Sequence, residues 1–231
     1  MKEITINGTI ISNNQQKYYD YKGIDAVCPR LVINQLKEAN GDDVRVLINS
    51  GGGLVFAGHE IFTALKNYQG HVETIVTGVA CSAASIILLA GDVVKASPGS
   101  QIMIHNVRSQ KSGDYRDMEH ERIVLEGSSD GLALIYAQKT GLPMAEIRQM
   151  MDNETWFTSK MAKEKGFVDE ILFDDSVQLV ANNGRVVPQK EIDEFYASLE
   201  KQSKEVKPSP FGRFVPKPSP FSKFTQKKEN K

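Results

Sequence analysis

The order of apolar and polar residues predicts a chain in which strands and helices alternate. Short runs rich in Val and Ile predict strands at 44–49, 72–77, 93–96, 102–104 and 167–173. Helical spacing or near-continuous apolar composition predicts helices at 55–68, 82–89, 117–139 and 158–165, with another helix starting at Pro143. Alternation at this density indicates βαβ units, and therefore an α/β fold with a sheet covered by helices.

The last 31 residues differ from the rest of the chain. Residues 201–231 contain five of the nine prolines and a repeat, KPSPFGRF followed by KPSPFSKF. They carry nine Lys and Arg against two Asp and Glu, whereas the other 200 residues hold the remaining 19 basic and 27 acidic side chains. We therefore predict a domain over 1–200 and a basic, flexible tail over 201–231. The tail is either a passive solvated segment or a docking peptide whose Phe pairs enter a partner's groove.

Composition limits the compartments and binding partners that are expected for the protein. Cys28 and Cys81 are too few for a disulfide scaffold or a zinc site. No window approaches 18 uninterrupted apolar residues, and the first six residues lack the apolar core of a secretory signal. We expect a cytoplasmic protein that binds neither membrane nor nucleic acid.

A glycine run lies between the first predicted strand and the first predicted helix. Its sequence, NSGGG over 49–53, allows positive φ angles and brings backbone N–H groups close to a ligand. A phosphate site, an oxyanion hole and a plain tight turn all use such a run. The P-loop interpretation is weak because Leu54 and Val55, not a lysine, follow Gly53.

Ser82 and His105 are the candidates for nucleophilic chemistry. Ser82 starts an apolar helix among small residues, so it is either a buried N-cap or a nucleophile on a strand-to-helix turn. His105 ends an apolar run 23 residues later, where it is either a core residue or a general base.

Four segments together resemble the ClpP family of serine peptidases. They are, in the order found in the family, INSGGGLVFAGHEIFTAL, GVACSAASIILLAG, MIHN and ETWFTSKMAKEKGFVDEI. The resemblance covers about residues 3–175 and is specifically to the shorter ClpP-like proteases of bacteriophages and prophages. It implies a ClpP/crotonase-like spiral of ββα units, with 117–139 as a projecting handle helix.

The resemblance also implies roles for individual residues. Ser82 takes the position of the nucleophile and His105 that of the base. Gly53 and Ala83 would supply the two oxyanion-hole N–H groups, with Gly52 shaping the loop. Cys81 beside the serine is disfavoured as a thiol nucleophile. The chemistry would be acyl transfer to Ser82 followed by hydrolysis, with no metal and no organic cofactor.

The family's catalytic triad also contains an acid, and at this position the chain departs from the family pattern. The family places an aspartate two residues before an aromatic residue, which here is Trp156, and that position holds Glu154. We expect Glu154 to orient His105, because a glutamate differs from an aspartate by one methylene. Asp152, two residues upstream, is the alternative, and a dyad without an acid also stays open.

The resemblance finally implies an assembly and a biological role. It predicts a homo-oligomeric ring, heptameric and stacked on a second ring, that cleaves peptide and protein substrates. The phage-type likeness favours a capsid (prohead) maturation protease acting on a capsid or scaffold protein in the host cytosol or the procapsid. The alternatives are the proteolytic subunit of an ATP-dependent Clp-type protease with an ATPase chaperone, a crotonase-type acyl-CoA enzyme, and a non-catalytic assembly scaffold. The segment KYYDYKG over 17–23 argues against docking to an ATPase.

Overall fold

The computed structural model describes residues 1–173 and 194–195. Contacts between Cα atoms divide the chain after Gln178, and the fold below is that of the first unit. The predicted boundary near residue 200, the basic tail and its repeat lie outside the described residues.

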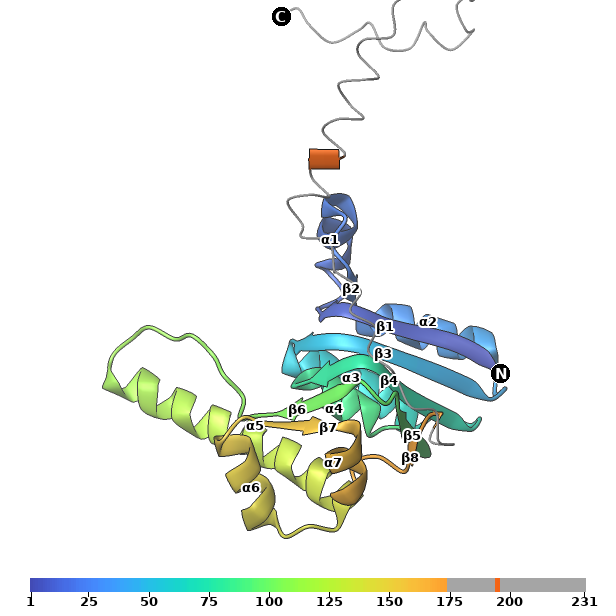
Figure 1. The fold of residues 1–231 in the computed structure, drawn as a ribbon. Coiled ribbons are helices and arrows are strands. Elements are labelled where there is room, and N and C mark those ends of the chain that lie inside the picture. The colour runs from blue at the N-terminus through green and yellow to red at the C-terminus, as the bar shows by residue number, and fades with distance from the viewer. Residues whose placement is uncertain (174–193, 196–231) are drawn as a thin grey trace, which may run out of the picture. The chain divides into compact units, whose positions relative to one another are not determined.

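A mostly parallel sheet forms the centre of this unit (Figure 1). Its main path runs in the order β2 (Ala26–Val27), β1 (Lys2–Ile10), β3 (Val44–Gly53), β4 (Val72–Cys81), β5 (Val93–Ala96) and β8 (Glu170–Ile171). A side branch starts at the end of β4. There β6 (Gln101–Ile104) runs parallel to β4, and β7 (Thr155–Thr158) runs antiparallel to β6. The branch brings the ends of β3, β4 and β6 together, and those ends carry the glycine run, Ser82 and His105.

Helices lie around this sheet, and most of them bury apolar side chains. They are α1 (Gln16–Lys22), α2 (Pro29–Ala39), α3 (Val55–Lys66), α4 (Ala83–Leu88), α5 (Tyr115–Thr140), α6 (Met144–Asp152) and α7 (Ser159–Glu164). Helices α2, α3 and α4 contact the central strands, and their buried side chains belong to one core. Every residue of α4 is buried, which accounts for its almost wholly apolar sequence. Among the helices of the described part, none has the length and apolar composition to cross a membrane.

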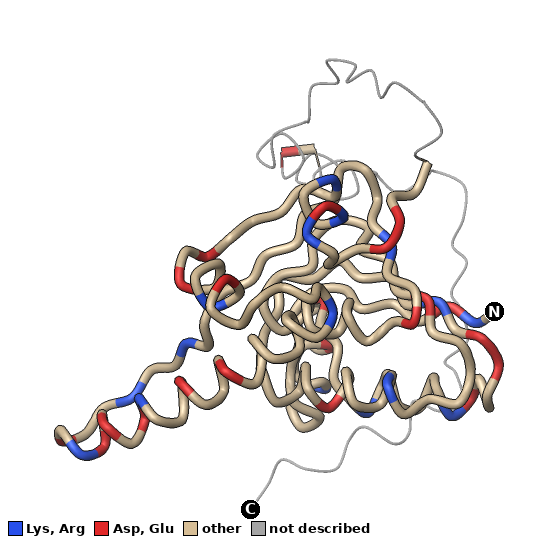
Figure 2. Tube along the Cα trace, turned by 90° about the horizontal axis from the view of Figure 1, so that it is seen from below, with Lys and Arg blue, Asp and Glu red and all other residues tan. Residues whose placement is uncertain are grey.

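The long helix α5 has two different halves. Its C-terminal half carries Leu132, Ala133 and Tyr136, which are fully buried in the core. Its N-terminal half, with Met118, is largely exposed and projects away from the sheet (Figure 1). The same projecting segment contains both basic and acidic residues (Figure 2). The predicted handle helix is therefore present, and only its C-terminal half packs on the chain's own core.

Capping explains why α5 starts before the predicted residue 117. The Asp114 carboxylate accepts hydrogen bonds from the backbone N–H groups of Arg116 and Asp117, and the Asp117 side chain accepts from the N–H of Asp114. This reciprocal arrangement satisfies N–H groups that the first turn leaves without helical partners.

Other elements differ from the sequence prediction because pairing and packing decide them. The glycine run was expected to form a turn, but β3 continues through it and pairs Gly52 and Gly53 with Thr9 and Ile10 of β1. The segment 167–173 shortens to the two-residue strand β8. Trp156, which precedes the predicted helix over 158–165, lies in the strand β7 opposite Met103.

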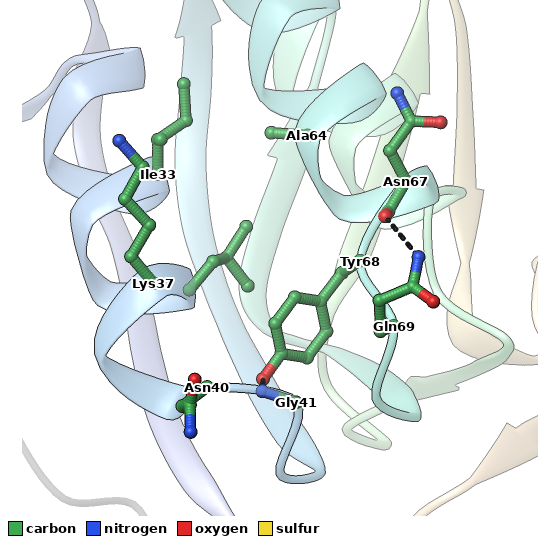
Figure 3. A pocket seen from close by; sticks show the side chains of 9 residues that line it. Ile33, Lys37, Asn40, Gly41, Ala64, Asn67, Tyr68 and Gln69 are labelled. Carbon is green, nitrogen blue, oxygen red and sulfur yellow. Dashed lines mark hydrogen bonds between the residues drawn. The ribbon is translucent and has the colours of Figure 1, made fainter.

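A hollow lies between the C-terminal ends of α2 and α3 (Figure 3). Ile33 and Ala64 line it, and Tyr68 closes one side, where its hydroxyl accepts from the Gly41 N–H at 2.9 Å. Gly41 precedes β3, whereas Gly53 ends that strand, so the hollow lies about 30 Å along the strand from the glycine run. The hollow is therefore separate from the candidate catalytic residues.

Candidate active site

Ser82 lies on a strained turn between β4 and α4. Its backbone has φ 54° and ψ −123°, a conformation that side-chain-bearing residues rarely adopt. Its N–H donates to the Met103 carbonyl at 2.9 Å, and its carbonyl accepts from the Ser85 N–H at 2.9 Å. The side chain makes no capping hydrogen bond to α4. Ser82 therefore occupies the N-cap position of α4 without capping the helix, and the turn leaves its hydroxyl available.

The Ser82 hydroxyl meets the ring of His105. The Oγ–Nε2 distance is 2.8 Å, a hydrogen bond between residues 23 positions apart. His105 directly follows β6, which pairs with the end of β4, so the parallel register of these strands carries it to the serine. The structure thus brings together the predicted nucleophile and base in the geometry that proton abstraction requires.

The surroundings of His105 keep its ring neutral near neutral pH. Burial lowers its pKa, the nearby Arg108 cation lowers it further, and the Glu154 carboxylate opposes both effects. A neutral imidazole can accept the serine proton through Nε2.

Side chains behind the serine hold the turn in place. Ser85 Oγ donates to the Ser82 carbonyl at 2.6 Å and lies 2.7 Å from the Tyr136 hydroxyl on α5. Tyr136 is fully buried, and burial raises the pKa of its hydroxyl far above the ordinary value. Beyond the histidine, the Val107 N–H donates to Ser129 Oγ at 3.1 Å, which ties the segment after β6 to α5. The sequence gives no local signal for these supports, because each joins residues far apart in the chain.

The glycine run passes directly against the serine turn. A Cβ placed on Gly52, whose φ is 96°, would lie 2.6 Å from the Cys81 carbonyl oxygen and 3.2 Å from the Ala83 nitrogen. A Cβ on Gly53, whose φ is 152°, would instead overlap the backbone of Ile10 in β1. The structure therefore places both expected oxyanion-hole residues, Gly53 and Ala83, on segments that are in contact beside Ser82.

The two candidate acids contact residues that follow His105. Asp152 Oδ1 accepts from the Asn106 side chain at 2.7 Å, and Glu154 Oε2 pairs with the guanidinium of Arg108. The buried Nδ1 of His105 has no hydrogen-bond partner among the described residues. Neither carboxylate is thus bonded to the histidine in this conformation, and the sequence did not single out Arg108 or Asn106.

Two other kinds of chemistry were considered for the site: a thiol nucleophile at Cys81 and a bound metal ion. Cys81 is 4% exposed, and burial together with the Glu154 charge raises the pKa of its thiol, so it stays protonated. The described residues hold no group of three or more His, Cys, Asp or Glu side chains arranged to bind a metal ion.

Comparisons with known proteins define the family. The family model described as Clp protease matches residues 9–175, and the chain belongs to this family. A relative in Bacteroides fragilis, named ATP-dependent Clp protease proteolytic subunit, is 35% identical over 134 residues, which are 57% of this chain and 65% of the relative. A relative of the same name in Pleurastrum terricola is 37% identical over 126 residues, 54% of this chain and 64% of the relative.

A solved structure supports the fold. A ClpP1 mutant from Listeria monocytogenes aligns with a TM-score of 0.61 at 23% identity, covering 74% of this chain and 91% of that chain. The predicted ClpP family membership and ClpP-like α/β fold are confirmed. The sequence matches span slightly less than two thirds of the curated relatives' own length.

Proposed function

We propose that this chain is a serine endopeptidase in which Ser82 is the nucleophile and His105 the general base. The observation that carries the proposal is the 2.8 Å contact between Ser82 Oγ and His105 Nε2 on a strained strand-to-helix turn. Such a turn exposes a hydroxyl at the end of a sheet, and the adjacent imidazole can remove its proton.

The proposed reaction proceeds in two halves. His105 takes the proton of Ser82 as Oγ attacks the peptide carbonyl, and then gives it to the departing amine. Backbone N–H groups of Gly53 and Ala83 would hold the oxyanion, each contributing about 3–4 kcal/mol of transition-state stabilisation. A water molecule, activated by the same histidine, hydrolyses the acyl-enzyme.

The names of the relatives guide the choice between two biological roles. The curated relatives are named ATP-dependent Clp protease proteolytic subunit, which favours the alternative role over the capsid maturation protease. We therefore propose that the chain is the proteolytic subunit of a Clp-type protease in the cytoplasm, fed by an ATPase chaperone. Capsid or scaffold processing in a phage or prophage remains a prediction from the sequence.

Self-assembly is part of this proposal. The projecting half of α5 leaves large apolar side chains in solvent, among them Tyr115 at 81% and Val124 at 54% exposure. Exposed apolar area of this kind on one helix suits a contact with a second copy. We propose that α5 pairs between two stacked rings, each of them heptameric.

Degradation of a folded substrate tests the role. The full chain is mixed with a folded, tagged protein, with or without a Clp-type ATPase and ATP, and a short fluorogenic peptide is hydrolysed in parallel. We expect the peptide to be cleaved in every mixture and the folded protein only with ATPase and ATP. Cleavage of a purified capsid protein without any ATPase would instead support the maturation role, and Ser82→Ala should abolish either activity.

A further inference from the structure

The histidine of the proposed dyad carries an unused donor. His105 Nδ1 is buried and has no hydrogen-bond partner in the described part of the chain. Buried polar atoms are nearly always paired, because a missing hydrogen bond destabilises the folded state. The ring therefore has a position ready for an acceptor that the present conformation does not supply.

The strand register indicates which acceptor is within reach. In the antiparallel ladder of β6 and β7, Met103 pairs with Trp156 and Ile104 with Thr155. One step beyond the last pair of the ladder, the same register sets Glu154 opposite His105, so the two residues leave neighbouring strands at the same end. The Glu154 charge also acts on the histidine, because it raises the His105 pKa.

Glu154 is turned to a different partner. Its Oε2 pairs with the guanidinium of Arg108, three residues beyond the histidine, and its backbone φ of 47° lies in the left-handed region, directly before β7 begins. The Glu154 and Arg108 side chains are 40% and 69% exposed. An ion pair this exposed changes an equilibrium by only about two- to fivefold, so it can open readily.

We propose that Arg108 and His105 compete for the Glu154 carboxylate. In the conformation described here Arg108 holds the carboxylate and the triad is incomplete. When the carboxylate moves to Nδ1, it accepts the Nδ1–H hydrogen bond, fixes the tautomer that leaves Nε2 free, and stabilises the imidazolium of the reaction. Arg108 is then a positioning residue that sets the fraction of complete triads. This inference rests on the proposed function.

The backbone allows the exchange with little rearrangement. The Val107 N–H is bonded to Ser129 Oγ on α5, and the Asn106 side chain is bonded to Asp152, so the segment between His105 and Arg108 is held at two points. The proposed exchange turns the Arg108 and Glu154 side chains, which are both partly exposed. Asp152 accepts from the Asn106 side chain, and the strand register does not set it opposite His105.

The rate at which Ser82 reacts with a fluorophosphonate, followed from pH 5 to pH 9, tests the competition. In Arg108→Gln, the rate on the alkaline plateau should rise about two- to fivefold, the size of an exposed ion pair. The midpoint of the acid limb should move to higher pH, because Arg108 lowers the His105 pKa and Glu154 raises it. Lys165→Gln removes a partly exposed cation, paired with Glu146 away from the site, and should change neither quantity. Arg108→Lys keeps the charge and should stay near the wild-type profile.

A double variant shows whether Arg108 acts through Glu154. Glu154→Gln should slow labelling, and adding Arg108→Gln to it should give no rate gain, because no carboxylate is left to release. An unchanged or slower rate in Arg108→Gln, or an equal gain in the absence of Glu154, would overturn the competition. Absence of any Ser82 labelling in the wild-type protein would instead overturn the proposed function itself.

Discussion

Replacement of Gly52 by alanine should damage the candidate site more than it damages the fold. Gly52 lies in the last part of β3, where φ is 96° and the backbone passes against the Ser82 turn. An added Cβ would lie 2.6 Å from the Cys81 carbonyl oxygen and 2.9 Å from the Ser82 Cβ. Both neighbours belong to the nucleophile's own turn, so relief of the overlap must move the serine.

The expected losses of stability and activity in Gly52→Ala follow from backbone strain at residue 52 and from displacement of Ser82. A non-glycine residue held in such a backbone conformation costs about 1–3 kcal/mol of folding free energy. For a domain of this size, each kcal/mol lowers Tm by about 2–4 °C. Relief of a 2.6 Å contact requires several tenths of an ångström, and a misplacement of about 1 Å at a reacting group reduces the rate about 100-fold. We therefore expect a Tm loss of about 2–12 °C and a loss of activity between about tenfold and 100-fold.

The neighbouring glycine offers a matched control. Gly51 has no positive φ, and a Cβ placed there meets no atom within 4 Å. Gly51→Ala should leave Tm unchanged or slightly raised, because alanine restricts the unfolded chain. Both variants are measured by thermal melting, by fluorophosphonate labelling and by hydrolysis of a short fluorogenic peptide. Equal labelling rates in Gly52→Ala and Gly51→Ala would refute the close approach of the glycine run to Ser82.

Three further predictions concern the acid, the assembly and the tail. Glu154→Gln should reduce peptide turnover more than Asp152→Asn, because the strand register sets Glu154 opposite His105; the reverse order would identify Asp152 as the orienting residue. Light scattering at micromolar concentration should give the mass of a ring, and Val124→Glu on the projecting half of α5 should split stacked rings; a fully active monomer would contradict the assembly. Deletion of residues 203–231 should leave hydrolysis of a short peptide unchanged and weaken action on a natural partner, whereas loss of peptide hydrolysis would make the tail part of the fold.

The sequence predicted the parts of the fold that local pattern controls. The strand 93–96 and the helix following Val55 agree with β5 and α3, because each has a clear apolar pattern bounded by turn residues. Pro143 was correctly placed at the start of α6. The glycine run was mistaken for a turn, because its strand conformation depends on pairing with β1, which local sequence does not encode. The strand β7 was missed for the same reason, because its conformation depends on pairing with β6.

The residues of the candidate site that lie in short sequence motifs could be predicted. The contacts between side chains far apart in the sequence could not. Ser82 and His105 were found from their places at a helix start and a strand end, and the structure brings them into contact. The pairing of Glu154 with Arg108 joins residues 46 positions apart, so no local pattern could indicate it. Tyr136 likewise supports the serine turn from α5, through Ser85, with no sign in the local sequence.

Site-specific labelling of the wild-type protein tests directly whether Ser82 is the nucleophile. The purified chain is treated with a fluorophosphonate, digested, and mapped by mass spectrometry, alongside Ser82→Ala and His105→Ala. We expect one modified side chain, Ser82, with no labelling in Ser82→Ala and strongly slowed labelling in His105→Ala, because nucleophile and base act as a unit. Labelling of a different residue, or full peptide turnover by Ser82→Ala, would contradict it.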